Sequence, residues 1–400
     1  MAFTKFSDDN QIIEYVLNNA ELFSSDAQLN VSEISDGNLN YVYRVADNAG
    51  NSLIVKQTPP YIRIIGEDWP LTQDRIRIEY QNLQFTAQHC PEYVPQVYHY
   101  GSEHCVLLME DIGDHQNLRE LLISRVKLPL FAQQVGNYLA QMLFRTSSMA
   151  LESTAHKSLV RESQNPELCK ISEEVFFWDP FCDHERNDVN PLIQNEAESI
   201  WQDNELKREV AILKRRFMSD TEALLHGDLH TGSLFATQKS CKVIDPEFSF
   251  CGPIGFDIGV LVANLLLNYA GQQNLSGDKA ERTDFQTWLL STVNDIWQQF
   301  SQSFTTLMAN ETIDPSLSDS GYQQWYLQQL WQDTLGYAGV EMTRRTIGIA
   351  HVADLMNIED TERRADSERL SLNIATTLIL QRTTISSPEQ LTEKVESLRL

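Results

Sequence analysis

Two short acidic segments in the second half of the chain have the residue types and spacing that phosphoryl transfer requires. Asp228 follows Gly227 in a His-Gly-Asp stretch, and an Asp-Pro-Glu stretch further along contains Asp245, Pro246 and Glu247. In an extended segment, side chains two residues apart face the same way. Asp245 and Glu247 would then form a hard oxygen site suited to Mg²⁺ and the phosphate oxygens that it binds. Asp228 could orient an attacking hydroxyl group and accept its proton.

The segment between these two motifs can bring them together. Residues 234–237 and 242–244 have the pattern of two short strands joined by a turn, which folds the chain back on itself. Either motif alone would be an ordinary turn or a solvated loop. Their combination at this spacing, together with features of the N-terminal part, favours a functional site.

The N-terminal part of the chain contains residues suited to binding phosphate groups. Residues 35–40, Ser-Asp-Gly-Asn-Leu-Asn, lie between two strand-like runs, and a hairpin that contains glycine can direct backbone N–H groups at phosphate oxygens. Lys56 lies on the next apolar strand, where a phosphate-binding lysine would be needed, and Glu79 on the following helix is its expected ion partner. The alternative interpretations are an ordinary hairpin turn for residues 35–40, a lysine on an edge strand for Lys56 and a solvated helix face for Glu79.

The hydrophobic pattern divides the chain into a small strand-rich part and a large helical part. In the first part we expect strands within 29–57, at 94–100 and at 105–109, and helices at 10–23 and 75–90. In the second part we expect helices at about 130–150, 196–224, 258–270, 283–308, 322–357 and 361–381. We therefore predict an α+β fold with two lobes, a small antiparallel sheet over residues 1–112 and a mainly helical lobe over 113–400. A cleft between two such lobes is a common place for a ligand.

Composition excludes several classes of function. Lys and Arg number 31 and Asp and Glu number 56, so the formal net charge is −25. Such a surface repels nucleic acids and anionic lipid headgroups, and we expect neither as a partner. The apolar run at 258–270 is too short to span a bilayer, and the first residues lack the pattern of a secretory signal. The six cysteines form no Cys-x-x-Cys pair, so we expect free thiols and a cytoplasmic protein.

Several stretches of the chain resemble one family of small-molecule kinases. They lie at 36–40, 54–57, 66–72, 226–233, 243–248, 252–259 and 343–346. Their residues and order resemble the protein-kinase-like fold in its aminoglycoside-phosphotransferase and choline-kinase branch, and within that branch the methylthioribose kinase family. Two departures from the wider kinase pattern are typical of this family. Ser233 replaces the usual metal-binding asparagine, and Asp-Pro-Glu replaces Asp-Phe-Gly.

The resemblance implies an activity and a set of residue roles. The reaction is the ATP-dependent phosphorylation of the anomeric C1 hydroxyl of 5-methylthioribose in methionine salvage, by a homodimer that uses Mg²⁺. Asp228 would contact the sugar and deprotonate it, and Arg344 would be the second sugar contact, with Arg345 as the alternative. The residues that would bind ATP are Asn40, Lys56, Glu110, Asp111, Ile112, Asp245, Pro246 and Glu247, of which Asp245 and Glu247 would also bind the metal.

The roles of several other residues depend on how they are oriented. Adjacent residues on a helix point about 100° apart, so we expect one of Arg344 and Arg345 to face the substrate and the other to pair with a carboxylate. We expect Asp257 to be structural and His226 to brace its loop. The sequence assigns no role to Trp69.

Two competing functions remain at this level. One is a kinase of another small alcohol, such as an aminoglycoside, choline or homoserine, and the arginine pair suits those cationic substrates less well than neutral sugar hydroxyls. The other is a catalytically dead nucleotide-binding scaffold. Such a scaffold would be expected to have lost the acidic residues or the lysine, all of which are present here.

Overall fold

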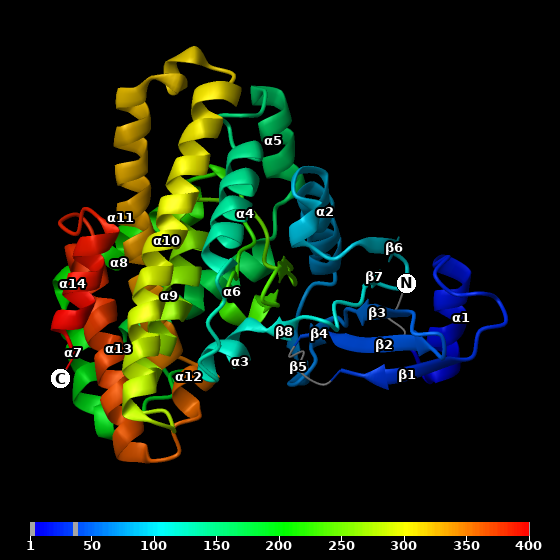
Figure 1. Cartoon of the computed structure of the whole chain (residues 1–400), viewed down its shortest axis with the longest axis horizontal. Helices are drawn as coiled ribbons and strands as arrows, with labels where there is room; N and C mark the ends of the chain where they lie inside the picture. Colours follow the sequence, from blue (N-terminus) through cyan, green and yellow to red (C-terminus); the bar gives the residue numbers. More distant parts are fainter. Residues whose placement is uncertain (1–4, 35–38, 400) are drawn as a thin grey trace.

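The computed structural model describes residues 5–34 and 39–399. Residues 35–38 of the predicted phosphate-binding loop therefore lie outside the described residues. Figure 1 shows a small sheet-containing lobe in blue and cyan beside a larger group of helices in green, yellow and red. The predicted α+β organisation, with an antiparallel sheet followed by a mainly helical region, is confirmed.

The first lobe is built on a five-stranded antiparallel sheet in the order β1-β2-β3-β7-β6. Its strands are β1 (Leu29–Glu33), β2 (Tyr41–Asp47), β3 (Ser52–Gln57), β6 (Val97–Gly101) and β7 (Val106–Glu110). Alternation puts Val45 and Val55 against helix α1 (Asp9–Asn19) on one face, and Ile54 and Leu107 against helix α2 (Arg75–His89) on the other. Lys56, two residues after Ile54, therefore points toward α2.

Helix α9 (Gly255–Gln272) forms the centre of the second lobe, and all of its residues are buried. Its sequence is largely apolar on every side, which is typical of a helix without a solvent face. Gly259 allows α11 (Ser320–Ile347) to approach closely, because a Cβ atom there would lie only 2.8 Å from the backbone oxygen of Thr334. This packing fixes the position of α11, which carries the arginine pair.

The remaining helices surround this centre or connect it to the sheet. They are α3 (Leu118–Ile123), α4 (Phe131–Arg145), α5 (Ser153–Glu162), α6 (Pro166–Val175), α7 (Gln194–Gln202), α8 (Asn204–Ser219), α10 (Lys279–Glu311), α12 (Ala353–Met356), α13 (Thr361–Gln381) and α14 (Pro388–Ser397). Within the part of the chain that the structure describes, no helix is both long and apolar enough to cross a membrane. The six cysteines are free, as predicted.

Short strand pairs hold the segments that carry the two acidic motifs. β10 (Leu234–Ala236) pairs with β11 (Cys241–Val243) and with β8 (Gln116–Asn117). β9 (Ala223–Leu224), just before the His-Gly-Asp stretch, pairs with β12 (Cys251–Gly252), just after the Asp-Pro-Glu stretch. Both motifs thus lie between paired strands. A further hairpin, β4 (Tyr61–Ile62) with β5 (Gly66–Pro70), carries Trp69.

Two of the predicted helices are each divided in two. The helix expected at 196–224 is two helices, because Asp203 ends α7 and caps α8 by accepting the backbone N–H groups of Glu205 and Leu206. The helix expected at 322–357 ends at Ile347, and Gly348 begins a non-helical link to α12. Helices α3, α5, α6 and α14 were not predicted, and each of them is short, with ten residues or fewer.

Candidate active site

The loop that carries Asp228 is held by backbone hydrogen bonds to one buried carboxylate. Asp257, in the first turn of α9, accepts the N–H groups of His226 and Gly227 at 2.6 and 3.0 Å. Gly227 has φ +86°, and a Cβ atom there would lie 2.1 Å from the backbone oxygen of Phe248, so only glycine fits. Asp257 therefore has the structural role that the sequence predicts.

His226 ties this loop to the strand that leads into the second acidic motif. Its Nε2 lies 2.9 Å from the backbone oxygen of Ile244, the residue before Asp245. The predicted brace is thus present. It keeps the Asp228 loop and the Asp245 segment next to each other, as the predicted strand–turn–strand requires.

The Asp228 carboxylate faces two arginines and a neutral histidine. Its Oδ1 lies 3.3 Å from Arg344 and 3.5 Å from Arg345, and its Oδ2 lies 3.5 Å from Nε2 of His230. Nδ1 of His230 accepts the N–H groups of Gly232 and Ser233, which leaves the proton on Nε2, facing Asp228. Burial, together with the charges of nearby arginines, holds the pKa of His230 well below its usual range. A neutral imidazole therefore supports this carboxylate.

The arginine pair is anchored by a third acidic residue on the same helix. Glu341 is fully buried, and its two oxygens lie 2.5 Å from Nε of Arg344 and 2.7 Å from Nε of Arg345. The guanidinium group of Arg344 also stacks over the ring of Phe176 at 3.7 Å. Burial opposes ionisation of Glu341, but the two arginines outweigh it and lower its pKa. The expectation that only one arginine pairs with a carboxylate is wrong, because both share Glu341.

Lys56 joins the sheet to helix α2 and to the metal motif. Its Nζ lies 2.7 Å from Oε2 of Glu79, which confirms the predicted ion pair, and it also contacts Oδ1 of Asp245. Burial opposes the charge of Lys56, but Asp245 and Glu79 outweigh it and raise its pKa. A cation that stays charged at this position is suited to binding phosphate oxygens.

The two carboxylates of the Asp-Pro-Glu stretch do not lie on one extended face. Asp245 has φ +68°, in the left-handed region, so the prediction of an extended segment is wrong. The two side chains therefore lie in different surroundings. The Asp245 side chain is 42% exposed and faces Lys56, whereas the Glu247 side chain is 2% exposed. Between them, the backbone oxygen of Pro246 accepts the N–H group of Ser249 at 3.2 Å, which closes a turn.

Glu247 is bound by two residues of the first lobe. Its Oε2 accepts a hydrogen bond from Nε of Arg75 at 3.0 Å, and both of its oxygens lie 3.1 Å from Nδ2 of Asn40. Asn40 is therefore placed beside the predicted metal motif. Its position is described even though residues 35–38 are not.

The segment that links the lobes is fixed at each of its predicted residues. The N–H group of Glu110 donates to the backbone oxygen of Gln96 at 2.7 Å, and the carboxylate of Asp111 binds Arg44 through two contacts of 2.7 and 3.0 Å. The backbone oxygen of Ile112 accepts the N–H group of His115 at 2.9 Å. The link is thus held in one conformation where β7 ends.

The three predicted carboxylates are adjacent to three different sets of cations. Asp228 faces the arginine pair, Asp245 faces Lys56 and Glu247 faces Arg75. Among the described residues there is no group of three or more acidic, histidine or cysteine side chains that could hold a metal ion. Asp245 fits a divalent cation, since it is a partly exposed carboxylate of the type that Mg²⁺ prefers. Glu247 has the same donor type, but Arg75 and Asn40 occupy it.

Sequence reasoning missed two residues of this site, Arg75 and Glu341. Arg75 precedes Glu79 by four residues, and Glu341 precedes Arg344 and Arg345 by three and four. Residues at these spacings lie on one helix face. The helical spacing therefore places each of them on the same face as a predicted site residue, but it does not identify the groups that they bind.

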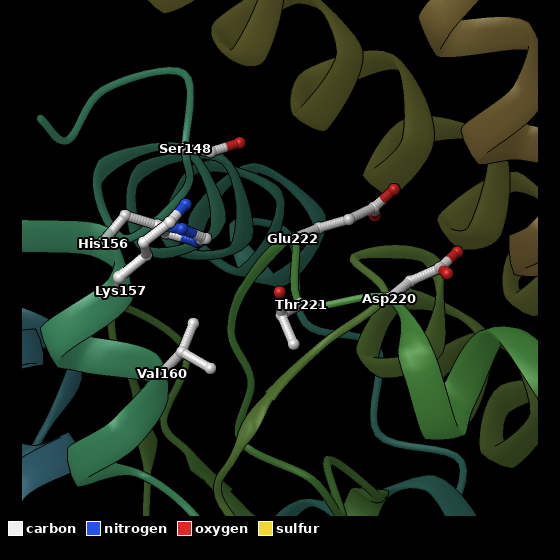
Figure 2. Close-up of a pocket in the computed structure, with 7 residues that line it drawn as sticks. All are labelled: Ser148, His156, Lys157, Val160, Asp220, Thr221 and Glu222. Carbon is white, nitrogen blue, oxygen red and sulfur yellow. The ribbon is translucent and has the colours of Figure 1, made fainter. Parts of the chain in front are cut away.

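A hollow of about 550 Å³ on the helical lobe contains none of the predicted site residues. Figure 2 shows α5 on one side of it and residues 220–222 on the other. Its lining residues are Ser148, His156, Lys157, Val160, Asp220, Thr221 and Glu222. These residues match no kinase motif and mix both signs of charge, so we do not place the active site there.

Known proteins resemble this chain in sequence and in fold. Residues 30–284 match the model of the phosphotransferase enzyme family. Methylthioribose kinase of Yersinia pseudotuberculosis serotype IB is 46% identical over 369 residues, which are 92% of this chain and 90% of that protein. Methylthioribose kinase of Pectobacterium carotovorum is 42% identical over 387 residues, 96% of each chain. The structure of choline kinase from Cryptosporidium parvum covers 94% of this chain and 98% of its own, at 15% identity and a TM-score of 0.50, which supports the predicted kinase-like fold.

Proposed function

Because the chain belongs to the phosphotransferase enzyme family, and within it to the methylthioribose kinases, we propose that it transfers the γ-phosphoryl group of ATP to the anomeric C1 hydroxyl of 5-methylthioribose. The products are 5-methylthioribose 1-phosphate and ADP, and the reaction belongs to methionine salvage. The observation that carries the proposal is the 46% identity to a methylthioribose kinase over 92% of this chain.

Asp228 orients the C1 hydroxyl and accepts its proton as the bond to phosphorus forms. Its loop is braced by Asp257, so little reorganisation is needed at the moment of reaction. Arg344, with Arg345 beside it, donates hydrogen bonds to the ribose hydroxyls, since a guanidinium group carries several donors in a fixed plane. Glu341 holds both arginines and thereby sets the place of the sugar relative to Asp228.

The first lobe and the Asp-Pro-Glu stretch bind ATP. Lys56 neutralises phosphate oxygens, and Asn40, whose amide nitrogen lies 3.1 Å from Glu247, contacts the nucleotide. Residues 110–112 offer backbone groups to the adenine ring. Asp245, Pro246 and Glu247 lie against the phosphates.

Mg²⁺ is the divalent cation that we propose for this site, held by Asp245 and Glu247. When bound, it neutralises charge that develops on the phosphate oxygens. Asp245 is partly exposed but contacts Lys56, and Glu247 must release Arg75 and Asn40 before it can bind the cation.

The remaining features of the proposal concern the whole molecule. Residues 1–112 and 113–400 form the two lobes of the kinase. The active protein is a cytoplasmic homodimer whose ligands are ATP and 5-methylthioribose, with neither nucleic acid nor membrane as a partner. A net charge of −25 supports the last two exclusions.

The test is an assay of ADP release with 5-methylthioribose, ribose and choline, each with and without Mg²⁺. We expect turnover with 5-methylthioribose only when Mg²⁺ is present, and kcat/KM values for ribose and choline lower by on the order of 10²-fold or more. Equal turnover with choline would indicate a kinase of another alcohol. Absence of ADP release with all three alcohols would favour a nucleotide-binding scaffold.

A further inference from the structure

Glu247 and three other buried polar side chains form one hydrogen-bond network. Arg75 donates to Glu247 at 3.0 Å and to Oδ1 of Asn40 at 3.2 Å, and the hydroxyl of Thr58 donates to the same Oδ1 at 2.9 Å. Arg75 also donates to the backbone oxygen of Thr72 at 2.6 Å. Two segments of the first lobe, through Arg75 and Asn40, therefore bind one carboxylate of the second lobe, and Thr58 holds Asn40 in place.

The pair of Arg75 and Glu247 is shielded from water. Arg75 is 0% exposed and Glu247 is 2% exposed. A buried carboxylate needs a positive partner, and removal of that partner leaves an uncompensated charge in a medium of low dielectric constant. Of the described groups, Arg75 is the one cation that makes an ion pair with Glu247.

Helix α2 connects both halves of the metal motif. Arg75 and Glu79 lie four residues apart on its buried side. Arg75 holds Glu247 directly, and Glu79 holds Lys56, which contacts Asp245. In Figure 1, α2 lies between the sheet and the helical lobe.

We propose that Arg75 is a positioning residue that serves as the exchangeable counter-ion of Glu247. It balances the Glu247 charge when the metal–nucleotide is absent and competes with the divalent cation for the same carboxylate. This inference rests on the proposed function only in that Glu247 is a metal ligand. No part of it depends on which alcohol is phosphorylated.

Competition between Arg75 and the metal predicts an unusual response to Mg²⁺. Without Arg75, the uncompensated Glu247 should destabilise the free protein, and a divalent cation should become its best available partner. We expect Arg75→Met to lower the Tm in EDTA by on the order of 5–10 °C. At a fixed concentration of ADP, the Mg²⁺ concentration that gives half of the Tm increase should fall by on the order of tenfold.

The experiment measures thermal unfolding with ADP and a series of MgCl₂ concentrations, without sugar and without turnover. The double variant Arg75→Met/Glu247→Gln removes both charges, so its Tm in EDTA should recover toward that of the wild type and its Mg²⁺ response should weaken. Arg75→Lys keeps the positive charge and should respond to Mg²⁺ like the wild type. Arg77→Met, on the same helix but partly exposed, is the matched control and should leave the response unchanged.

The outcomes separate this proposal from a purely structural role and from the proposed function. If Arg75→Met is less stable and Mg²⁺ with ADP restores no more stability than in the wild type, Arg75 is not in exchange with the metal. If Arg75→Met does not fold, an undiminished Mg²⁺ response in the double variant would overturn the proposal, because Glu247 would then not be the ligand. Failure of the sugar assay would leave these measurements unaffected.

Discussion

The buried carboxylate of Glu341 offers the sharpest test of how the sugar site is built. Replacement with glutamine keeps the shape of the side chain and one oxygen but removes the negative charge that two arginines share. The contacts are 2.5 and 2.7 Å long and fully buried, so solvent screens them little. Removing one partner of a buried ion pair costs roughly 3–5 kcal/mol, and we expect about 3 kcal/mol because the glutamine oxygen can still accept a hydrogen bond.

This loss is measurable by urea unfolding. Because the m-value in urea increases with size and should be at least about 3 kcal/mol/M for this chain, a loss of about 3 kcal/mol shifts the midpoint by up to about 1 M. The variant should remain folded in the absence of urea, because native proteins have free energies of unfolding of roughly 5–15 kcal/mol. The matched control is Glu393→Gln, an exposed glutamate on α14, which should change the stability by less than about 0.5 kcal/mol.

Activity should fall in Glu341→Gln as well. The unbalanced guanidinium groups have Asp228 as their nearest remaining carboxylate and should move toward it, which occupies the lone pairs that must accept the proton. We expect kcat to fall by on the order of 10²-fold, with the affinity for ADP unchanged. A variant that unfolds within about 0.5 kcal/mol of the wild type and keeps its kcat would refute the assignment of Glu341 as the anchor of the arginine pair.

Three further predictions concern the Asp228 loop. Asp228→Asn should lower kcat by on the order of 10³-fold while ADP binding, measured by calorimetry, stays within about twofold; a near-normal kcat would contradict its role as the base. Gly227→Ala should lower the free energy of unfolding by more than about 2 kcal/mol and abolish turnover, because its Cβ would collide with the backbone oxygen of Phe248; unchanged unfolding curves would contradict that geometry. The pKa of His230 is lower in the folded state than its ordinary value of 6.5. At a pH below 6.5, His230 therefore binds a proton more readily in the unfolded chain than in the folded protein. Stability should therefore be complete above pH 6.5 and fall as the pH falls below it, by up to about 1.4 kcal/mol per pH unit. In His230→Asn this contribution to the pH dependence of the unfolding free energy should be absent. The measurement is urea unfolding of both proteins at pH 7.5 and 5.5, and an equal loss of stability between these pH values in both would contradict the prediction.

Sequence patterns were sufficient for features that depend on neighbouring residues. The apolar run around Lys56 predicted a strand, the spacing of residues 75–90 predicted a helix, and the ion pair expected between Lys56 and Glu79 is present. The glycine before Asp228 was visible as part of a tight turn. Each of these follows from the period of one helix or strand, which a single sequence contains.

Features that depend on a single dihedral angle or on distant partners were not predictable in this way. The positive φ of Asp245 is unusual for a residue other than glycine, and nothing in Asp-Pro-Glu indicates it. The partner of Glu247, Arg75, lies 172 residues earlier in the chain. Such a long-range pair becomes visible only when both lobes are in place. Glu341 is close in sequence to both arginines that it binds, but a glutamate three or four residues before an arginine usually forms a solvent-exposed ion pair.

The distribution of these charges explains how a chain with a net charge of −25 can accommodate a polyphosphate. Repulsion from surface carboxylates is screened over about 8 Å at physiological ionic strength, so it acts on the approach of ATP more than on the bound state. At the site itself, Lys56 and Arg75 are both at least nine-tenths buried, and each already has a carboxylate partner. If a phosphate group of ATP replaces the Asp245 carboxylate at Lys56, the local charge stays nearly unchanged. The released Asp245 carboxylate then becomes available to the divalent cation that arrives with ATP. In this arrangement nucleotide and metal are expected to bind together, because neither exchange is favourable without the other.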